Sequence, residues 1–224
     1  METPNAPTSI NHRILEGLTR VATAMRIDEW DRAKATGLNP TQLAILDLLE
    51  GRAGGLGVKD IAVHLGVSQP TATDSVGALE RKGLLAKKAV EGDRRAVRVV
   101  VTAEGLSVLS SGSQGAGLAE RAVDALDPVR QQHLLTTLVA MIRHLQEIDA
   151  IPIQRMCVGC RHFAPYAHSD AAQPHHCNLV DAAFGQRDLR VDCREHETAD
   201  PQSRAATWDR FLQGSDQPLQ ANQG

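Results

Sequence analysis

The stretch VKDIAVHLGVSQPTATDSVGALERKGLL, residues 58–85, determines the fold expected for this chain. Its apolar residues recur at helical spacing over residues 58–65, and Gly66 then supplies a turn. Ser68 is the expected N-cap of a second helix, because its hydroxyl can accept from the free backbone N–H groups of the first turn. Pro70 fits that first turn, where its missing N–H has no partner to lose. The stretch therefore predicts two short helices joined by a tight turn.

Directly after this helix pair, the pattern changes from helical to extended. The runs LLAKKAV (residues 84–90) and AVRVVVT (residues 96–102) are typical of β-strands, and the charged segment EGDRR (residues 91–95) separates them. This arrangement predicts a β-hairpin with a charged tip. Helix, turn, helix and hairpin is the element order of a winged helix-turn-helix. In that fold the second helix enters the major groove of DNA, and the hairpin carries basic residues to the phosphates or the adjacent minor groove.

Longer helices are expected on both sides of these elements. Apolar steps of three and four residues predict a first helix that ends near Gly37, and Asn39-Pro40 begins a second. After the hairpin, residues 103–126 are predicted as one helix with three glycines in its middle. Asp127-Pro128 begins another helix, whose apolar residues recur in steps of four and three. This heptad seam is typical of helix packing and equally of dimer contact. It consists of Leu134, Leu138, Met141, Leu145 and Ile148.

The charge of the chain is distributed unevenly. The formal net charge is −3, yet residues 56–100 carry eight Lys and Arg against five Asp and Glu. A basic segment on an acidic body is the electrostatic pattern of a phosphate-binding surface, although charge alone fits a solvated face as well. Aromatic residues make up only 3% of the chain, so the core must consist mainly of aliphatic side chains.

No segment of the sequence predicts export or membrane insertion. Residues 1–9 are polar and lack the apolar region of a secretory signal, and no run approaches the roughly 18 apolar residues of a membrane helix. We therefore expect a cytoplasmic protein with no membrane partner. We also find no nucleophile–base arrangement, phosphate-binding glycine loop or catalytic carboxylate pair, so we expect no enzymatic activity.

Three segments together resemble the MarR family of bacterial transcriptional regulators. They are GLNPTQLAILDLL (residues 37–49), the opening stretch, and GDRRAVRVVVTAEG (residues 92–105), and the resemblance covers residues 8–149. It implies a homodimer with interlocked terminal helices and two winged domains that read a pseudo-palindromic operator in double-stranded DNA. It also implies that Arg95 enters the minor groove and that Asp93 holds this arginine in place. Val101 departs from the leucine usual in the wing.

The resemblance and the element order together assign the residues expected at DNA. The second helix of the pair supplies short polar residues for base edges or phosphates, and the wing supplies cations for phosphates. Asp74 stands where many relatives carry a basic residue, so we expect affinity to depend mainly on the wing. The helix residues are Ser68, Gln69, Thr71, Thr73 and Asp74, and the wing residues are Lys87, Lys88, Arg94, Arg95 and Arg98.

All four cysteines of the chain lie in one segment after the last predicted helix. Cys157, Cys160, Cys177 and Cys193 have the spacing C-x2-C-x16-C-x15-C. In a reducing compartment such a group is more typical of metal ligands than of disulfides. A segment of this size buries little core, so a metal or a cluster is its usual stabiliser. Thiolates bind zinc and iron–sulfur clusters alike.

The choice between these two centres depends on the spacing. Structural zinc sites usually present two close ligand pairs, whereas this segment has one pair and two solitary cysteines. The spacing resembles that of high-potential iron–sulfur proteins, which implies a 4Fe–4S cluster held by all four cysteines. We expect that cluster and keep zinc as the alternative. The apolar cover of the site would consist of Phe163, Tyr166, Leu179, Phe184 and Leu189.

The expected fold class is mainly α with a small β-hairpin wing, followed by a small loop-rich domain that a metal or cluster stabilises. We expect a winged-helix and dimerisation domain over residues 1–149 and a four-cysteine domain over residues 156–197. Residues 198–224 are expected to be disordered, apart from a short helix around Trp208, Phe211 and Leu212.

The function predicted from both halves is a DNA-binding transcriptional regulator, most simply a repressor, whose activity depends on a redox- or iron-sensing cluster. One alternative is a MarR-type regulator that senses a small aromatic ligand and carries a structural zinc site. A more remote alternative is an iron–sulfur electron-transfer protein.

Overall fold

A computed structural model describes residues 9–90, 93–111 and 116–215, with the side chains of residues 90, 93–96 and 215 left out. The chain divides into an N-terminal unit, Met1–Leu126, and a C-terminal unit, Asp127–Gly224. No helix in the described part of the chain combines the length and the apolarity needed to span a membrane.

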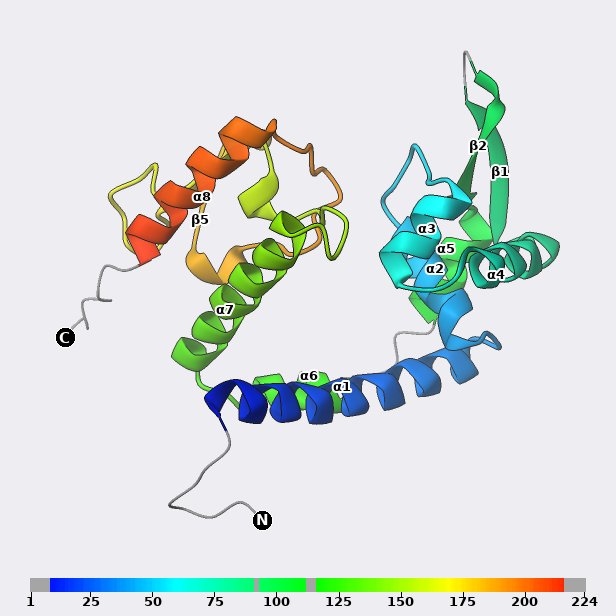
Figure 1. The fold of residues 1–224 in the computed structure, drawn as a ribbon, viewed down its shortest axis with the longest axis horizontal. Helices are drawn as coiled ribbons and strands as arrows, with labels where there is room; N and C mark the ends of the chain where they lie inside the picture. The colour runs from blue at the N-terminus through cyan, green and yellow to red at the C-terminus, as the bar shows by residue number, and fades with distance from the viewer. Residues whose placement is uncertain (1–8, 91–92, 112–115, 216–224) are drawn as a thin grey trace. The chain divides into compact units, whose positions relative to one another are not determined.

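The N-terminal unit contains the predicted winged helix (Figure 1). Its elements are α1 (Ile10–Ala35), α2 (Pro40–Leu49), α3 (Val58–Leu65), α4 (Gln69–Arg81), β1 (Leu85–Val90), β2 (Asp93–Val101), α5 (Ala103–Ser111) and α6 (Leu118–Asp124). The predicted helix starts are confirmed: the side chain of Ser68 accepts from the backbone of Thr71, and Asn39 forms a capping box with Gln42.

The core of this unit lies between α2, α3, α4 and the base of the hairpin. It is aliphatic, as the scarcity of aromatic residues predicts. In α4 the buried positions alternate with exposed ones at helical spacing, so one side of the helix faces the core and the other faces solvent. The most deeply buried members of the core are Ile45, Leu46, Leu49, Ile61, Ala72, Val76, Leu79 and Val99.

Two glycines permit close backbone approaches around the hairpin. Leu56 pairs with Val99 at the edge of β2, and a Cβ at Gly55 would lie only 2.3 Å from the carbonyl oxygen of Val99. Gly55 also has a φ of +61°, a conformation that favours glycine. A Cβ at Gly105 would lie 2.4 Å from the carbonyl oxygen of Leu84, so α5 can pack against the start of β1 only with glycine there. These contacts hold the hairpin firmly at its base.

The single helix predicted over residues 103–126 is wrong, because the chain forms α5 and α6 as two separate helices. The glycines in this region favour such an interruption. The start of α6 has no side-chain cap of its own. Instead, the carboxylate of Asp28 on α1 accepts from the backbone N–H groups of Leu118 at 2.8 Å and Ala119 at 3.0 Å. Figure 1 shows α6 lying along α1, in agreement with these bonds.

Asp28 gives this packing a defined pH dependence. The hydrogen bonds from Ala119 and Leu118 lower the pKa of the Asp28 carboxyl group below its ordinary value. The stabilisation is therefore present above the ordinary pKa of aspartate, about 3.9, and is lost as the pH falls through the lowered value. We expect Asp28→Ala to lower the thermal unfolding temperature at pH 7 and to make little difference at strongly acidic pH. Thermal scans over a pH series measure this.

The control for that experiment is Asp31→Ala, which removes an exposed carboxylate from the same helix. We expect this variant to unfold close to the wild-type temperature at every pH. An equal effect of the two substitutions at pH 7 would contradict the capping role of Asp28.

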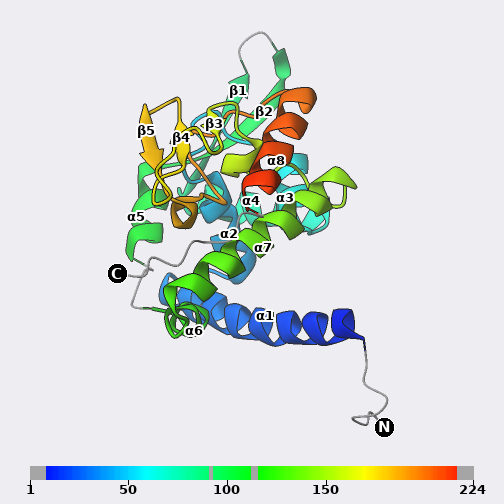
Figure 2. The same cartoon turned by 90° about the vertical axis from the view of Figure 1, so that its left-hand side faces the viewer.

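The C-terminal unit consists of two helices and a small sheet (Figure 2). The sheet is antiparallel, with the order β3-β4-β5, and Phe163 of β3 pairs with Cys177 of β4. The elements are α7 (Pro128–Glu147), η1 (Cys157–Gly159), β3 (Phe163–Ala164), β4 (His175–Cys177), β5 (Ala182–Phe184), η2 (Gln186–Asp188) and α8 (Pro201–Ser215).

These boundaries differ from the domain division predicted from the sequence. The division falls at residue 126, so α7 belongs with the cysteine segment instead of with the winged helix. The short helix expected around Trp208, Phe211 and Leu212 is present as α8, which occupies residues 201–215. The side chain of Phe211 is fully buried, which makes α8 part of the folded unit.

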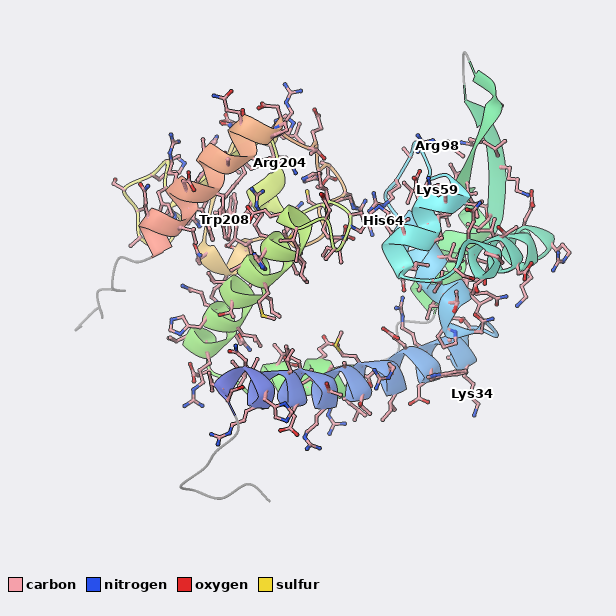
Figure 3. All side chains as sticks on the ribbon, in the orientation of Figure 1. Lys34, Lys59, His64, Arg98, Arg204 and Trp208 are labelled. Atoms are coloured by element: carbon pink, nitrogen blue, oxygen red, sulfur yellow. The ribbon has the colours of Figure 1, made fainter. Side chains whose placement is uncertain are left out.

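A mixed aliphatic and aromatic core explains this division. Residues from α7, from the cysteine segment and from α8 bury one another, so none of the three segments has a complete core alone. The positively charged Arg143 of α7 lies 5.9 Å from the ring centre of Trp208, which α8 presents towards it (Figure 3). The buried members of this core are Val139, Met156, Val158, Phe163, Leu189 and Phe211.

Candidate DNA interface and four-cysteine site

The residues predicted to read DNA lie on the exposed side of α4. Ser68, Gln69, Thr71, Thr73 and Asp74 are all exposed at the start of this helix, whereas the alternate positions are buried in the core. The start of α4 is therefore a polar surface on a rigid helix. This arrangement is the one a recognition helix requires, since its first residues reach the base edges.

The hydroxyl groups on this surface are partly engaged within the helix. The Ser68 and Thr71 hydroxyls bond to each other at 2.7 Å, and the Thr73 hydroxyl donates to the carbonyl oxygen of Gln69. Their role at DNA is thus limited to the hydrogen-bonding capacity that remains. Gln69 and Asp74 have the least restricted side chains of the five, because neither side chain has a hydrogen-bond partner among the side chains that are described.

The described wing cations lie on both strands of the hairpin, but two of them already have acidic partners. Lys87 forms an ion pair with Glu80 of α4 at 2.6 Å, and Arg98 lies 3.9 Å from Asp60 of α3. Lys88 is exposed and lies opposite Arg98 in the hairpin register. Figure 3 labels Arg98 together with Lys59, which α3 contributes nearby. The basic character of the hairpin base therefore rests mainly on Lys88 and on the exposed part of Arg98.

The tip of the wing contributes the remaining predicted residues. Asp93, Arg94 and Arg95 begin β2, and their side chains lie outside the described part of the structure. Their roles therefore remain predictions from the family resemblance.

The four cysteines gather around a single cavity. Cys157, Cys160, Cys177 and Cys193 all line it, and none of them forms a disulfide. Among the described residues, no three His, Cys, Asp or Glu side chains are placed to hold one metal ion. The other lining residues are His162, Phe163, Leu179, Phe184 and Glu195, of which Phe163, Leu179 and Phe184 were expected in the apolar cover.

Two of the cysteines are held by pairing between distant segments. The backbone N–H of Cys157 donates to the carbonyl oxygen of Arg190 at 2.9 Å, and that of Cys193 donates to Arg155 at 2.8 Å. An ion pair between the buried Arg155 and the exposed Asp192 joins the same two segments. These contacts, between residues 155–157 and 190–193, form what we call the cysteine latch. They fix the backbone at Cys157 and Cys193.

The other two cysteines are held by local turns and by the sheet. The backbone N–H of Cys160 donates to the carbonyl oxygen of Cys157 at 2.9 Å, which closes the turn of η1. Cys177 is fixed by its place in β4 between two strands. Backbone hydrogen bonds therefore hold the main chain in place at all four cysteines.

Two groups in this region have shifted pKa values. Burial raises the pKa of the Cys157 thiol to about 11, an effect that the N–H group of Arg190 partly opposes. His175 is fully buried and its pKa is lowered by burial. Its Nδ1 atom accepts from the backbone of Tyr166, which leaves Nε2 to donate to Gln186. His175 is therefore a core residue with both ring nitrogens engaged, and it is not a free metal ligand.

Comparison with known proteins bears on the N-terminal unit. A family model matches α2, α3, α4 and the start of the wing. That model describes the MarR family, and it covers residues 36–96. No curated protein matches the chain. The MarR-type segment thus corresponds to the helix pair and hairpin from which the winged helix was predicted.

Several solved structures resemble part of this chain. A MarR transcriptional regulator from Methanosarcina mazei is 18% identical, with a TM-score of 0.50, and the match covers 61% of this chain and 99% of that one. The MepR–DNA complex of S. aureus is 22% identical over 58% of this chain and 97% of that one, with a TM-score of 0.48. NadR in complex with 4-hydroxyphenylacetate is 23% identical over 65% and 97%, with a TM-score of 0.47.

Sequence reasoning missed several residues of the cysteine site. Arg155, Arg190 and Asp192 were not singled out, although the first two contact cysteines through their backbone atoms. Charged residues next to the outer cysteines were the available signal. Arg155 and Asp192 are 37 residues apart in the sequence, so no local pattern predicts that they pair.

Proposed function

We propose that this chain is a homodimeric DNA-binding transcriptional regulator, and that its four cysteines bind an iron–sulfur cluster through which redox or iron status modulates DNA binding. The observation that carries the first half is the exposed polar start of α4 on a winged helix of the MarR type. The observation that carries the second half is the convergence of all four cysteines on one cavity.

DNA binding by this surface follows from its shape and chemistry. An α-helix fits the major groove, and glutamine can bind an adenine edge through two hydrogen bonds. Gln69 occupies the first turn of α4 and is exposed, which suits such a contact. Lys88 and Arg98 on the hairpin suit phosphate, and Arg95 at the tip is proposed for the minor groove by resemblance.

A homodimer is supported by apolar residues that remain exposed on two long helices. On α7 the heptad seam predicted from the sequence faces away from the core of its own unit, since Leu134, Met141 and Leu145 are each 38–39% exposed. On α1, Ile10, Ile14, Val21 and Met25 are also exposed. Exposed apolar stripes of this kind mark protein–protein contacts. A second copy of the chain is the partner that the resemblance implies.

The base-reading role of Gln69 makes a direct prediction. A duplex is first selected from a random pool by the full-length chain, and binding is then measured by fluorescence anisotropy against a scrambled duplex. We expect Gln69→Ala to reduce the preference for the selected duplex by about 1–3 kcal/mol, because one bidentate base contact contributes that much discrimination. Gln173→Ala, an exposed glutamine in the C-terminal unit, should leave the preference unchanged.

Lys88→Ala provides the contrasting arm of this experiment. A phosphate contact does not distinguish one base from another. This variant should therefore lower the affinity for both duplexes equally and reduce the salt slope of binding by about 1. Equal preference for both duplexes in the wild-type chain would overturn the proposed regulator function.

An iron–sulfur cluster suits the arrangement of thiols better than a single ion does. Zinc–sulfur bonds of about 2.3 Å require four sulfurs to meet at one point. A 4Fe–4S cluster needs one thiolate for each of its irons, so its cysteines stand apart around a space. All four cysteines line one cavity, and Phe163, Leu179 and Phe184 provide apolar walls. Such walls limit solvent access and help to set a cluster's potential.

Zinc remains the rival centre, and metal analysis separates the two. Anaerobically purified chain should contain about four iron and four sulfide per cysteine site and absorb visible light. About one zinc per chain with no sulfide would show that the site binds zinc and would contradict the proposed redox sensing.

Packing within the C-terminal unit connects the proposed cluster site to the proposed dimer seam on α7. The 3₁₀ turn η2 precedes the cysteine latch, and its Arg187 donates to Gln131 of α7 at 2.8 Å. Leu189, next to the latch, is buried in the same core as Val139 of α7. The helix that carries the proposed dimer seam thus forms part of the unit that surrounds the cysteines. Loss of the cluster would therefore loosen the support of that seam.

A further inference from the structure

Arg190 occupies a special place among the residues around the cavity. Its backbone N–H donates to the Sγ atom of Cys157 at 3.3 Å, and its guanidinium Nη1 atom lies 3.7 Å from the Sγ atom of Cys193. One residue therefore directs two N–H donors at two of the four sulfurs.

The position of Arg190 is fixed by the cysteine latch. Its carbonyl oxygen accepts from the N–H group of Cys157, so its backbone cannot turn away while the latch is closed. Its guanidinium group also lies 3.5 Å from Glu195, which orients the side chain along the edge of the site. The ion pair between the buried Arg155 and the exposed Asp192 holds the neighbouring backbone. The two donors are thus held in place by the protein before any centre is bound.

We propose that Arg190 is a positioning residue that stabilises the reduced form of the cluster and so sets the potential at which the regulator responds. This inference rests on the proposed function, because it requires the cluster to be present. One-electron reduction adds a negative charge to the cluster, and the electron comes from an external reductant. N–H donors and positive charge at the ligating sulfurs favour the more negative state, so they raise the reduction potential.

The test compares the midpoint potentials of cluster-loaded full-length variants by anaerobic titration in a spectroscopic cell. We expect Arg190→Gln to lower the potential, so that the ratio of oxidised to reduced cluster at a fixed potential rises about threefold or more. Arg190→Lys keeps the charge and should restore part of the shift. Iron and sulfide are measured in each sample, so that incomplete loading is not mistaken for a change in potential.

Arg161→Gln is the matched control. Arg161 has nearly the same side-chain exposure as Arg190, 63% against 64%, and it too pairs with a glutamate, Glu197 at 3.2 Å. The substitution changes the net charge equally, but the contacts of Arg161 are made with Glu197 and involve no cysteine sulfur. We expect its potential to stay close to the wild-type value.

The outcomes separate this inference from the function on which it rests. A cluster-loaded wild type whose potential is shifted equally by both substitutions, or by neither, would overturn the role of Arg190 alone. A wild-type chain that holds zinc and no sulfide would overturn the cluster proposal, and this inference with it. A lower potential in Arg190→Gln alone, with partial recovery in Arg190→Lys, supports the positioning role.

Discussion

Replacing Cys177 by serine is expected to abolish the cluster and with it the redox dependence of DNA binding. Each iron of a 4Fe–4S cluster needs its own thiolate, and a serine hydroxyl is a harder and much weaker ligand for it. We expect iron and sulfide to fall from about four per chain to less than one, and the visible absorbance to disappear. Colorimetric iron and sulfide assays on anaerobically purified chain measure this.

The same variant tests whether the cluster controls DNA binding. Wild-type chain should change its affinity for the selected duplex after treatment with an oxidant, whereas Cys177→Ser should bind equally before and after. Asn178→Ser is the control, because it introduces a serine at the neighbouring exposed position and keeps all four cysteines. Wild-type and Cys177→Ser chains that both ignore the oxidant would show that the cysteine site does not regulate binding.

Replacing Phe211 by alanine is expected to produce the largest loss of stability. Phe211 is fully buried on α8, and its ring lies 6.2 Å from Phe163 and 5.5 Å from Trp208. Truncating a buried phenylalanine typically costs about 3–5 kcal/mol, because it removes apolar burial and leaves a cavity. Hydrogen exchange over α8 should therefore accelerate by about two to three orders of magnitude if it proceeds through opening of this unit.

Leu212→Ala is the comparison for this substitution. Leu212 is the next residue of α8 and is 41% exposed, so its truncation should cost about 1 kcal/mol or less. Mass spectrometry of deuterium uptake reports on α8 directly and does not require reversible unfolding. Fast exchange throughout α8 in the wild-type chain would contradict the placement of this helix in the core.

The winged helix could be predicted from the sequence because its signals are local. Ser68, Asn39 and Gly66 each mark a helix end within a few residues, and the change from helical to alternating pattern marks the hairpin. The exposure of the polar residues on α4 follows from the same pattern. The cysteines could also be predicted to form one site, because all four lie close together in the sequence.

The remaining features depend on contacts between segments far apart in the sequence. Trp208, Phe211 and Leu212 predict a short helix in the otherwise polar segment 198–224, and only the partners of Phe211 explain why α8 packs. The assignment of α7 to the C-terminal unit depends on Val139 burying itself against residues that follow it by about twenty to seventy positions. The cysteine latch likewise joins two segments that no periodicity relates.

The packing of α7 has a consequence for the synthesis of the protein. This helix leaves the ribosome before Leu189 and Phe211 have been translated, so the side of it that they cover is bare during that interval. Its other side carries Leu134, Met141 and Leu145, which are exposed in the single chain and belong to the proposed dimer seam. A nascent helix that is apolar on two sides favours chaperone binding or aggregation. The first of these sides is covered only after the chain has been translated as far as Phe211.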